Sequence, residues 1–183
     1  EQVARGNGYS FSTVLGGNAL VAATTTNVPA IWNPPSSGRV LLIQCVKFGR
    51  TAKGTPLEGS IVYHRQTSVQ GLGTGADIIS GTAVAGINLR SDLADNSKML
   101  FFPTTISTTF TPAVWGASGV AQTADNGATT VSGPHTDCGV VDWLYGLLQV
   151  WPGSFMSMGA AVSISTTYTI SILGLSLPKP DFA

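Results

Sequence analysis

The sequence predicts an all-β protein: a β-sandwich, in its favoured version a jelly roll, with long loops and little helix. Alternation of apolar and polar side chains at every second residue recurs along the chain, whereas the three- and four-residue spacing of amphipathic helices is nearly absent. Clusters of Gly, Pro, Asn and Ser separate eight or more such segments. A jelly roll tolerates the long, irregular connections between them. An immunoglobulin-like sandwich is the alternative, but the spaced Cys–Trp–Cys pattern is missing.

The clearest predicted strand is Val40–Phe48, which is rich in branched residues. It follows a predicted turn at Asn33–Gly38, where two prolines cannot donate to a ladder and Gly38 permits a positive φ. A second break at Gly54–Pro56 precedes the strand that starts over Gly59–Tyr63. The loop between them has several residues, so this is not a tight two-residue hairpin.

Ser165–Pro178 alternates most regularly, with Tyr168, Ile170 and Ile172 on one face, and this predicts a strand with one face in the core. Residues 75–98 fit either a short helix or an edge strand with a long crossover loop. Further predicted strands are Tyr9–Val14, Ala19–Ala23, Met99–Phe102, Ser107–Thr111, Leu144–Trp151 and Phe155–Met158, the last two flanking a turn at Pro152–Ser154.

The length of 183 residues fits one domain with a sizeable core. We expect a single sandwich over residues 19–183, preceded by residues 1–18 as an N-terminal arm or first strand. Residues 116–139 are rich in Gly, Ala, Ser and Thr and predict a long loop excursion.

Charge is scarce: nine basic and nine acidic residues cancel, and only 10% of the chain is charged. Soluble domains carry about a quarter. Because no cluster of Lys and Arg is present, we expect no nucleic-acid partner. No apolar run is long enough for a membrane span, so we expect no membrane partner. A subunit whose neighbours cover its surface needs less charge for solubility, which favours a role in assembly.

The sharpest enzymatic hypothesis is a Cys–His nucleophile drawn from Cys45, Cys138, His64 and His135. His135, Asp137 and Cys138 are close in sequence, but catalytic partners usually converge from separate elements. A turn held by the Asp137 side chain explains the cluster more simply. We therefore predict no enzyme and no catalytic residue.

Metal and cofactor sites are not expected either. Paired Cys-x2-Cys or His-x3-His spacings do not occur, and Asp92 and Asp95 are too few for a calcium loop. Gly71–Asp77 is glycine-rich but lacks the Lys-Ser/Thr ending of a phosphate-binding loop.

The tryptophans offer a binding alternative. Trp32, Trp115, Trp143 and Trp151, with Tyr145, could form a platform that stacks on sugars. For such a module we expect Trp115 or Trp143 on an exposed loop. Tryptophan is more often buried in a core or in an interface.

Residues 33–63 and 147–161 resemble structural proteins of tailed bacteriophages, of the jelly-roll head decoration (cement) type. The first region shares an Asn-Pro turn, a Ser-Gly-basic step, an apolar strand and a Gly-Thr-Pro loop; the second shares a Val-x-Pro-Gly-Ser turn. Two departures are Arg50, where an aromatic is expected, and the excursion over residues 116–139. The matching positions are Asn33, Pro34, Ser37, Gly38, Arg39, Gly49, Gly54, Thr55 and Gly59.

The resemblance implies a virion subunit that forms a homotrimer and stabilises the head lattice. Its partners would be itself and the major capsid protein or another virion protein, on the surface of a capsid assembled in the host cytoplasm. Residues 1–17 and 177–183 are the expected attachment segments. The alternative function is a phage fibre or a lectin-like, glycan-binding receptor module.

Overall fold

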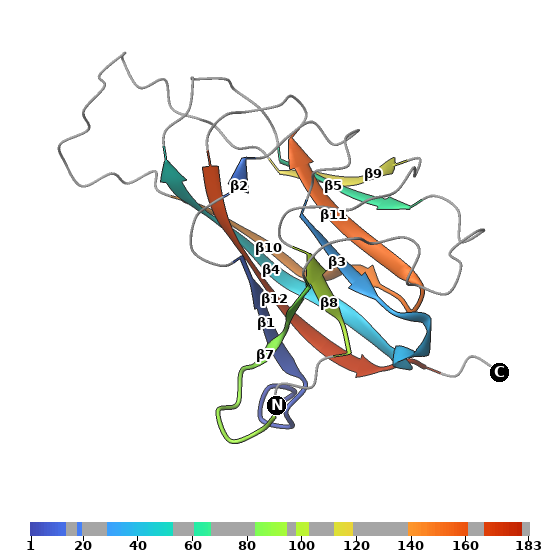
Figure 1. The fold of residues 1–183 in the computed structure, drawn as a ribbon. Coiled ribbons are helices and arrows are strands. Elements are labelled where there is room, and N and C mark those ends of the chain that lie inside the picture. The colour runs from blue at the N-terminus through green and yellow to red at the C-terminus, as the bar shows by residue number, and fades with distance from the viewer. Residues whose placement is uncertain are drawn as a thin grey trace, which may run out of the picture.

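The computed structural model describes residues 1–13, 18–19, 29–52, 61–66, 83–94, 98–102, 112–118, 139–160 and 167–180. These residues form two antiparallel β-sheets that lie face to face (Figure 1), and no α-helix occurs among them. The predicted all-β sandwich is confirmed.

The first sheet has the order β10-β4-β12-β1-β7, with β2 paired to β12 beyond the end of β1. Its strands are β1 (Gly8–Ser12), β2 (Asn18–Ala19), β4 (Arg39–Ala52), β7 (Ile87–Asn88), β10 (Gly139–Val150) and β12 (Thr167–Pro178). The second sheet has the order β6-β8-β3-β11-β5-β9. Its strands are β3 (Ala30–Asn33), β5 (Ile61–Gln66), β6 (Val84–Ala85), β8 (Leu100–Phe102), β9 (Pro112–Ser118) and β11 (Ser154–Ala160).

The pairing is that of a jelly roll. With the short strands β2, β6, β7 and β8 set aside, the chain pairs from its two ends inward: β1 with β12, β3 with β11, β4 with β10, and β5 with β9. The contacts of β12 with β4 and of β11 with β5 then join these pairs into two sheets. Such a double Greek key places strands distant in sequence side by side.

The turn before β4 forms as predicted. Pro35–Ser37 makes one 3-10 turn (η1), and Gly38 ends it with φ 63° in the left-handed region. The Asn33 side chain reinforces the turn, because Nδ2 donates to the carbonyls of Arg39 (2.7 Å) and Val150 (2.8 Å). One amide therefore ties together the neighbouring ends of β3, β4 and β10.

The core lies between the two sheets. The alternation predicted for the last strand is confirmed, since Tyr168, Ile170 and Ile172 are buried and the intervening Thr169 and Ser171 are not. Phe48 of β4 meets Tyr168 edge-on, with ring centroids 6.4 Å apart. The other members are mainly aliphatic, aromatic and methionine side chains: Tyr9, Phe11, Ile31, Leu41, Ile43, Val46, Tyr63, Met99, Phe101, Leu148, Val150, Met156 and Met158.

Several boundaries differ from the sequence predictions. β10 begins at Gly139 rather than Leu144, and β3 and β9 were not predicted. Of the two interpretations of residues 75–98, the described part contains edge strands, β6 in the second sheet and β7 in the first. The predicted strand Ser107–Thr111 lies outside the described residues, as does Ala19–Ala23 beyond Ala19.

The predicted N-terminal segment and the predicted loop excursion both include residues that lie in strands. Gly8–Ser12 forms β1 between β12 and β7, so this part of residues 1–18 lies within the first sheet. Gly116 to Ser118 belong to β9 and Gly139 begins β10, while the rest of the predicted excursion lies outside the described residues.

Candidate functional site on the outer face of β10

A row of exposed apolar side chains runs along β10, the strand at one edge of the first sheet. Val141, Trp143, Tyr145 and Leu147 have exposed fractions of 51%, 56%, 74% and 79%. Val141 and Trp143 occupy alternate positions in a regularly paired part of the strand, so their Cα atoms are about 7 Å apart. We call these four residues the β10 row.

The row is not needed for the core. The side chains that alternate with it point inward: Leu144 packs against the core, and Leu148 and Val150 are buried. Apart from Asp142 and Gln149, the segment "VDWLYGLLQV" is thus apolar on both faces, although an edge strand of a sandwich normally presents polar residues to water.

A bulge makes part of the row protrude. Trp143 pairs with Cys45 of β4, but the next pair is Leu148 with Ile43, so residues 144–147 lie opposite Gln44 alone. Tyr145 and Gly146 both adopt left-handed backbone conformations, with φ of 48° and 79°. For a bulky residue such as Tyr145 that conformation costs about 1–2 kcal/mol.

The two aromatic rings of the row contact each other. Trp143 and Tyr145 stack with ring centroids 6.0 Å apart and an interplanar angle of 23°. Beneath this pair the sheet is apolar, because Trp143 is in register with the buried Cys45 on β4, which in turn is in register with the half-buried Leu173 on β12. The result is an aromatic patch with an aliphatic border.

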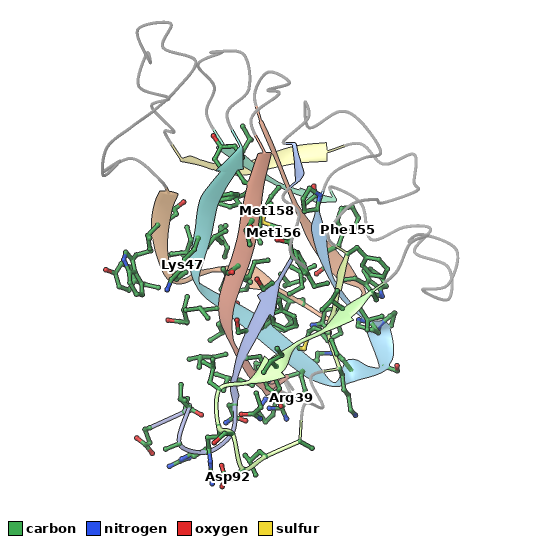
Figure 2. The ribbon with its side chains drawn as sticks, turned by 60° about the vertical axis from the view of Figure 1, so that its left-hand side comes forward. Arg39, Lys47, Asp92, Phe155, Met156 and Met158 are labelled. Carbon is green, nitrogen blue, oxygen red and sulfur yellow. The ribbon has the colours of Figure 1, made fainter. Side chains whose placement is uncertain are left out.

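Charge is sparse beside the row. Lys47 of β4 is exposed and lies in register with Val141. Figure 2 shows Lys47 projecting from the outer side of the first sheet, whereas Met156 and Met158 lie between the sheets. A partner that covers the row would therefore meet the Lys47 cation at its border.

The inner side of β10 is fixed by a polar contact between the sheets. The Tyr63 hydroxyl of β5 donates to the Asp142 carboxylate at 2.8 Å. Burial raises the pKa of Tyr63, and the hydrogen bond and negative charge of Asp142 raise it further. This bond holds β10 in place directly beneath Val141 and Trp143.

Trp115 and Trp143 lie in strands and not on the exposed loop expected for a sugar-binding module. Trp143 is in β10, while Trp115 is in β9, the edge strand of the second sheet, with its side chain outside the described part. Trp32 is buried in β3 and Trp151 is half-buried. Of that set, Trp143 and Tyr145 stack on each other.

The residues considered for nucleophilic catalysis are not gathered in the described part. Cys45 is buried in β4, and burial raises the pKa of its thiol, which disfavours the thiolate. His64 lies in β5 of the other sheet, and His135 and Cys138 are outside the described residues. Where side chains are described, no group of three or more His, Cys, Asp or Glu could hold a metal ion.

Comparison with protein-family models, with curated proteins and with solved structures found no match. The part of the chain that the structure describes contains no helix with the length and apolar character of a transmembrane span.

Proposed function

We propose that this chain is a structural subunit that associates with copies of itself through the β10 row. The single observation that carries the proposal is the row of four exposed apolar side chains on an edge strand whose inner face already fills the core. Trp and Tyr at the centre of an apolar patch are the residues that most often dominate protein–protein contacts.

Two features of the sequence give the proposal its context. The chain has only 10% charged residues, as suits a subunit whose surface is covered after assembly. The turn motifs of residues 33–63 and 147–161 resemble those of phage head decoration proteins. We accordingly propose a homotrimer that attaches to a capsid shell protein and stabilises the head lattice, with no catalytic role.

The geometry of β10 favours contact through side chains over extension of the sheet. A free edge strand can pair with a strand of another chain, and proteins block this with bulges that twist the edge away. The bulge at residues 144–147 interrupts the edge of β10 in this way. It also moves the side chains of Tyr145 and Leu147 outward from the sheet. These side chains would insert into a hollow on the neighbouring subunit.

The test is the mass in solution, by light scattering, of the natural protein and two variants. We expect the natural protein to have about three times its chain mass of 18.9 kDa and Leu147→Asp to have the mass of one chain. Ile87→Asp is the matched control, because Ile87 is 58% exposed on β7 at the other edge of the same sheet. It should keep the mass of the natural protein.

Both side chains are exposed, so neither variant should unfold, and circular dichroism checks this. A natural protein that stays monomeric at micromolar concentration contradicts the proposal. So does a Leu147→Asp variant that keeps the oligomeric mass.

A glycan-binding module is the second candidate, and the stacked, exposed Trp143–Tyr145 pair favours it. Aromatic faces bind the apolar faces of sugars, although two rings stacked on each other leave only their outer faces free. Glycan-array binding that is lost in Trp143→Ala but kept in Leu147→Asp would favour this candidate. Absence of binding by the natural protein would remove it.

A further inference from the structure

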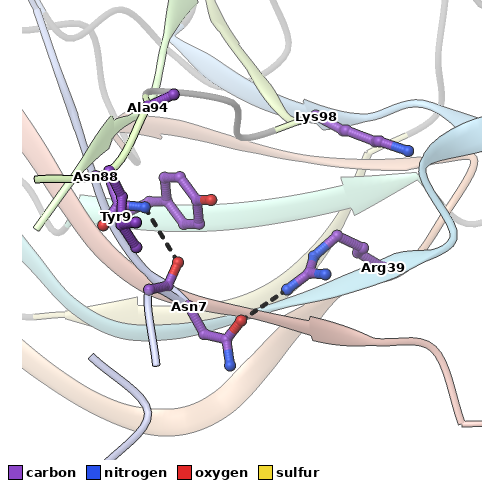
Figure 3. A pocket seen from close by; sticks show the side chains of 8 residues that line it. Asn7, Tyr9, Arg39, Asn88, Ala94 and Lys98 are labelled. Carbon is purple, nitrogen blue, oxygen red and sulfur yellow. Dashed lines mark hydrogen bonds between the residues drawn. The ribbon is translucent and has the colours of Figure 1, made fainter. Parts of the chain in front are cut away.

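We propose that a pocket at the opposite edge of the first sheet binds a small oxyanion, that is, a molecule bearing carboxylate or phosphate groups. The pocket lies where the N-terminal turn, β1, β7 and the start of β4 meet, and it has a volume of about 460 Å³ (Figure 3). That volume is in the range of small-molecule sites. The lining residues are Gly6, Asn7, Tyr9, Arg39, Asn88, Leu93, Ala94 and Lys98.

The charge of the lining is positive. Arg39 and Lys98 are the charged residues among the described lining, and neither makes an ion pair with a described carboxylate. The described acids at this end of the molecule pair with other arginines, Glu1 with Arg5 and Asp92 with Arg90. An oxyanion in the pocket would therefore neutralise two cations that the described protein leaves without a counter-charge.

Arg39 is held in position before any ligand arrives. Its Nε donates to Ser176 Oγ at 2.7 Å, and its Nη2 donates to Asn7 Oδ1 at 2.9 Å and to the Ser176 carbonyl. These bonds fix the guanidinium plane, and within the described residues they leave Nη1 without an acceptor. A fixed guanidinium recognises the planar or tetrahedral oxygens of carboxylate and phosphate well, because little side-chain entropy is lost on binding.

The uncharged residues of the pocket are also held in place, by hydrogen bonds and by packing. Asn88 Nδ2 donates to the Gly6 carbonyl at 3.1 Å, and Asn88 Oδ1 accepts from the Arg90 amide at 2.9 Å. Gly6 has φ 77°, and a Cβ there would collide with Leu93 Cδ1, so the glycine allows Leu93 to close one wall. Asn7 is held by its bond to Gln2, at 2.8 Å.

The pocket and the β10 row can act separately. The row lies on β10, opposite residues 44–47 of β4. The pocket is lined by Tyr9 of β1 and Asn88 of β7, at the far end of the strand order, and it reaches β4 at its first residue, Arg39. The proposal of an oxyanion site therefore does not depend on the proposed assembly.

The test is a calorimetric titration with inorganic phosphate and, separately, with citrate, at constant ionic strength. We expect saturable binding of at least one of the two by the natural protein. Lys98→Gln should weaken it about three- to tenfold, as expected for removing one exposed charge next to a bound anion. Lys47→Gln removes the same charge from the outer face of β4 and should leave binding unchanged.

Side-chain amide NMR signals of Asn7 and Asn88 report where the anion binds, and they should shift with the same titration curve. Binding of phosphate alone would identify phosphate-bearing ligands, and binding of citrate alone would identify carboxylates. Failure of both anions to saturate overturns the proposal. Equal weakening of anion binding in Lys47→Gln and Lys98→Gln overturns the proposal as well. It would mean that the anion is attracted by the overall charge of the protein and not by the pocket.

Discussion

At the scale of single residues, the contact between Tyr63 and Asp142 decides how β10 is held. The Tyr63 side chain is only 1% exposed, and its hydroxyl donates to Asp142 across the sandwich at 2.8 Å. A phenolate in this place would lose its hydration and face a carboxylate. Both effects keep the pKa of Tyr63 well above its ordinary value of 10.0.

This pKa shift predicts a loss of stability in alkali. The pKa of Tyr63 is higher in the folded than in the unfolded protein, so its contribution is fully present below the unfolded value and is lost as the pH rises above it. We expect the free energy of unfolding, measured with urea from about pH 8 to about pH 11, to fall above about pH 10. In Tyr63→Phe it should be about 1–3 kcal/mol lower at pH 8 and should fall less steeply.

Parallel curves for the natural protein and Tyr63→Phe would mean that another group causes the decline.

At the scale of elements, alternation predicted the strands that bury one face. Ile170 and Ile172 of β12 are buried and Thr169 and Ser171 are not, a pattern that can be read from the sequence. β3 has no such signal, because all four of its residues, Ala30–Asn33, are buried. β9 begins at a proline and contains a glycine, both of which normally argue against a strand.

Only part of the candidate site could be predicted from the sequence. Trp143 could be singled out as a large aromatic residue, but Val141 and Leu147 could not, because β10 is apolar on both faces. Which face is exposed depends on the partners of the strand. β10 pairs with β4, about a hundred residues earlier in the chain, and no local pattern encodes that pairing or the edge position that results from it.

The bulge in β10 predicts a substitution that stabilises the chain and impairs its association. Tyr145 holds a left-handed conformation that asparagine adopts at lower cost. Tyr145→Asn should therefore raise the free energy of unfolding by about 0.5–1 kcal/mol. It should also weaken self-association, because it removes an aromatic side chain from the β10 row.

The stability is best measured by urea denaturation in the monomeric Leu147→Asp background, so that association does not contribute. Gly146→Ala is the opposite control: at φ 79° an added Cβ is strained, and we expect a loss of about 1 kcal/mol. A destabilised Tyr145→Asn would show that the tyrosine ring contributes more to folding than its backbone strain costs.

At the scale of the whole molecule, the jelly roll separates two unlike edges of one sheet. The strand order β10-β4-β12-β1-β7 places the apolar row at one end and the cationic pocket at the other. The pocket reaches β4 at its first residue, Arg39, whereas the row lies opposite residues 44–47 of the same strand, so one edge can be covered by a neighbouring subunit while the other stays open to solvent. This asymmetry allows the two surfaces to be tested by separate substitutions.

If copies of the chain associate through the row, its thermal stability must depend on concentration, because only the folded state associates. For a trimer that dissociates on unfolding, a tenfold rise in concentration favours the folded state by about 0.9 kcal/mol per chain, which raises the melting temperature by about 2–4 °C. Scanning calorimetry over a hundredfold range of concentration should show this rise in the natural protein and in Ile87→Asp. Leu147→Asp should melt at one temperature throughout. A concentration-independent melting temperature in the natural protein would mean that the row stays exposed to water, and the stacked Trp143–Tyr145 pair would then be tested first as a glycan contact.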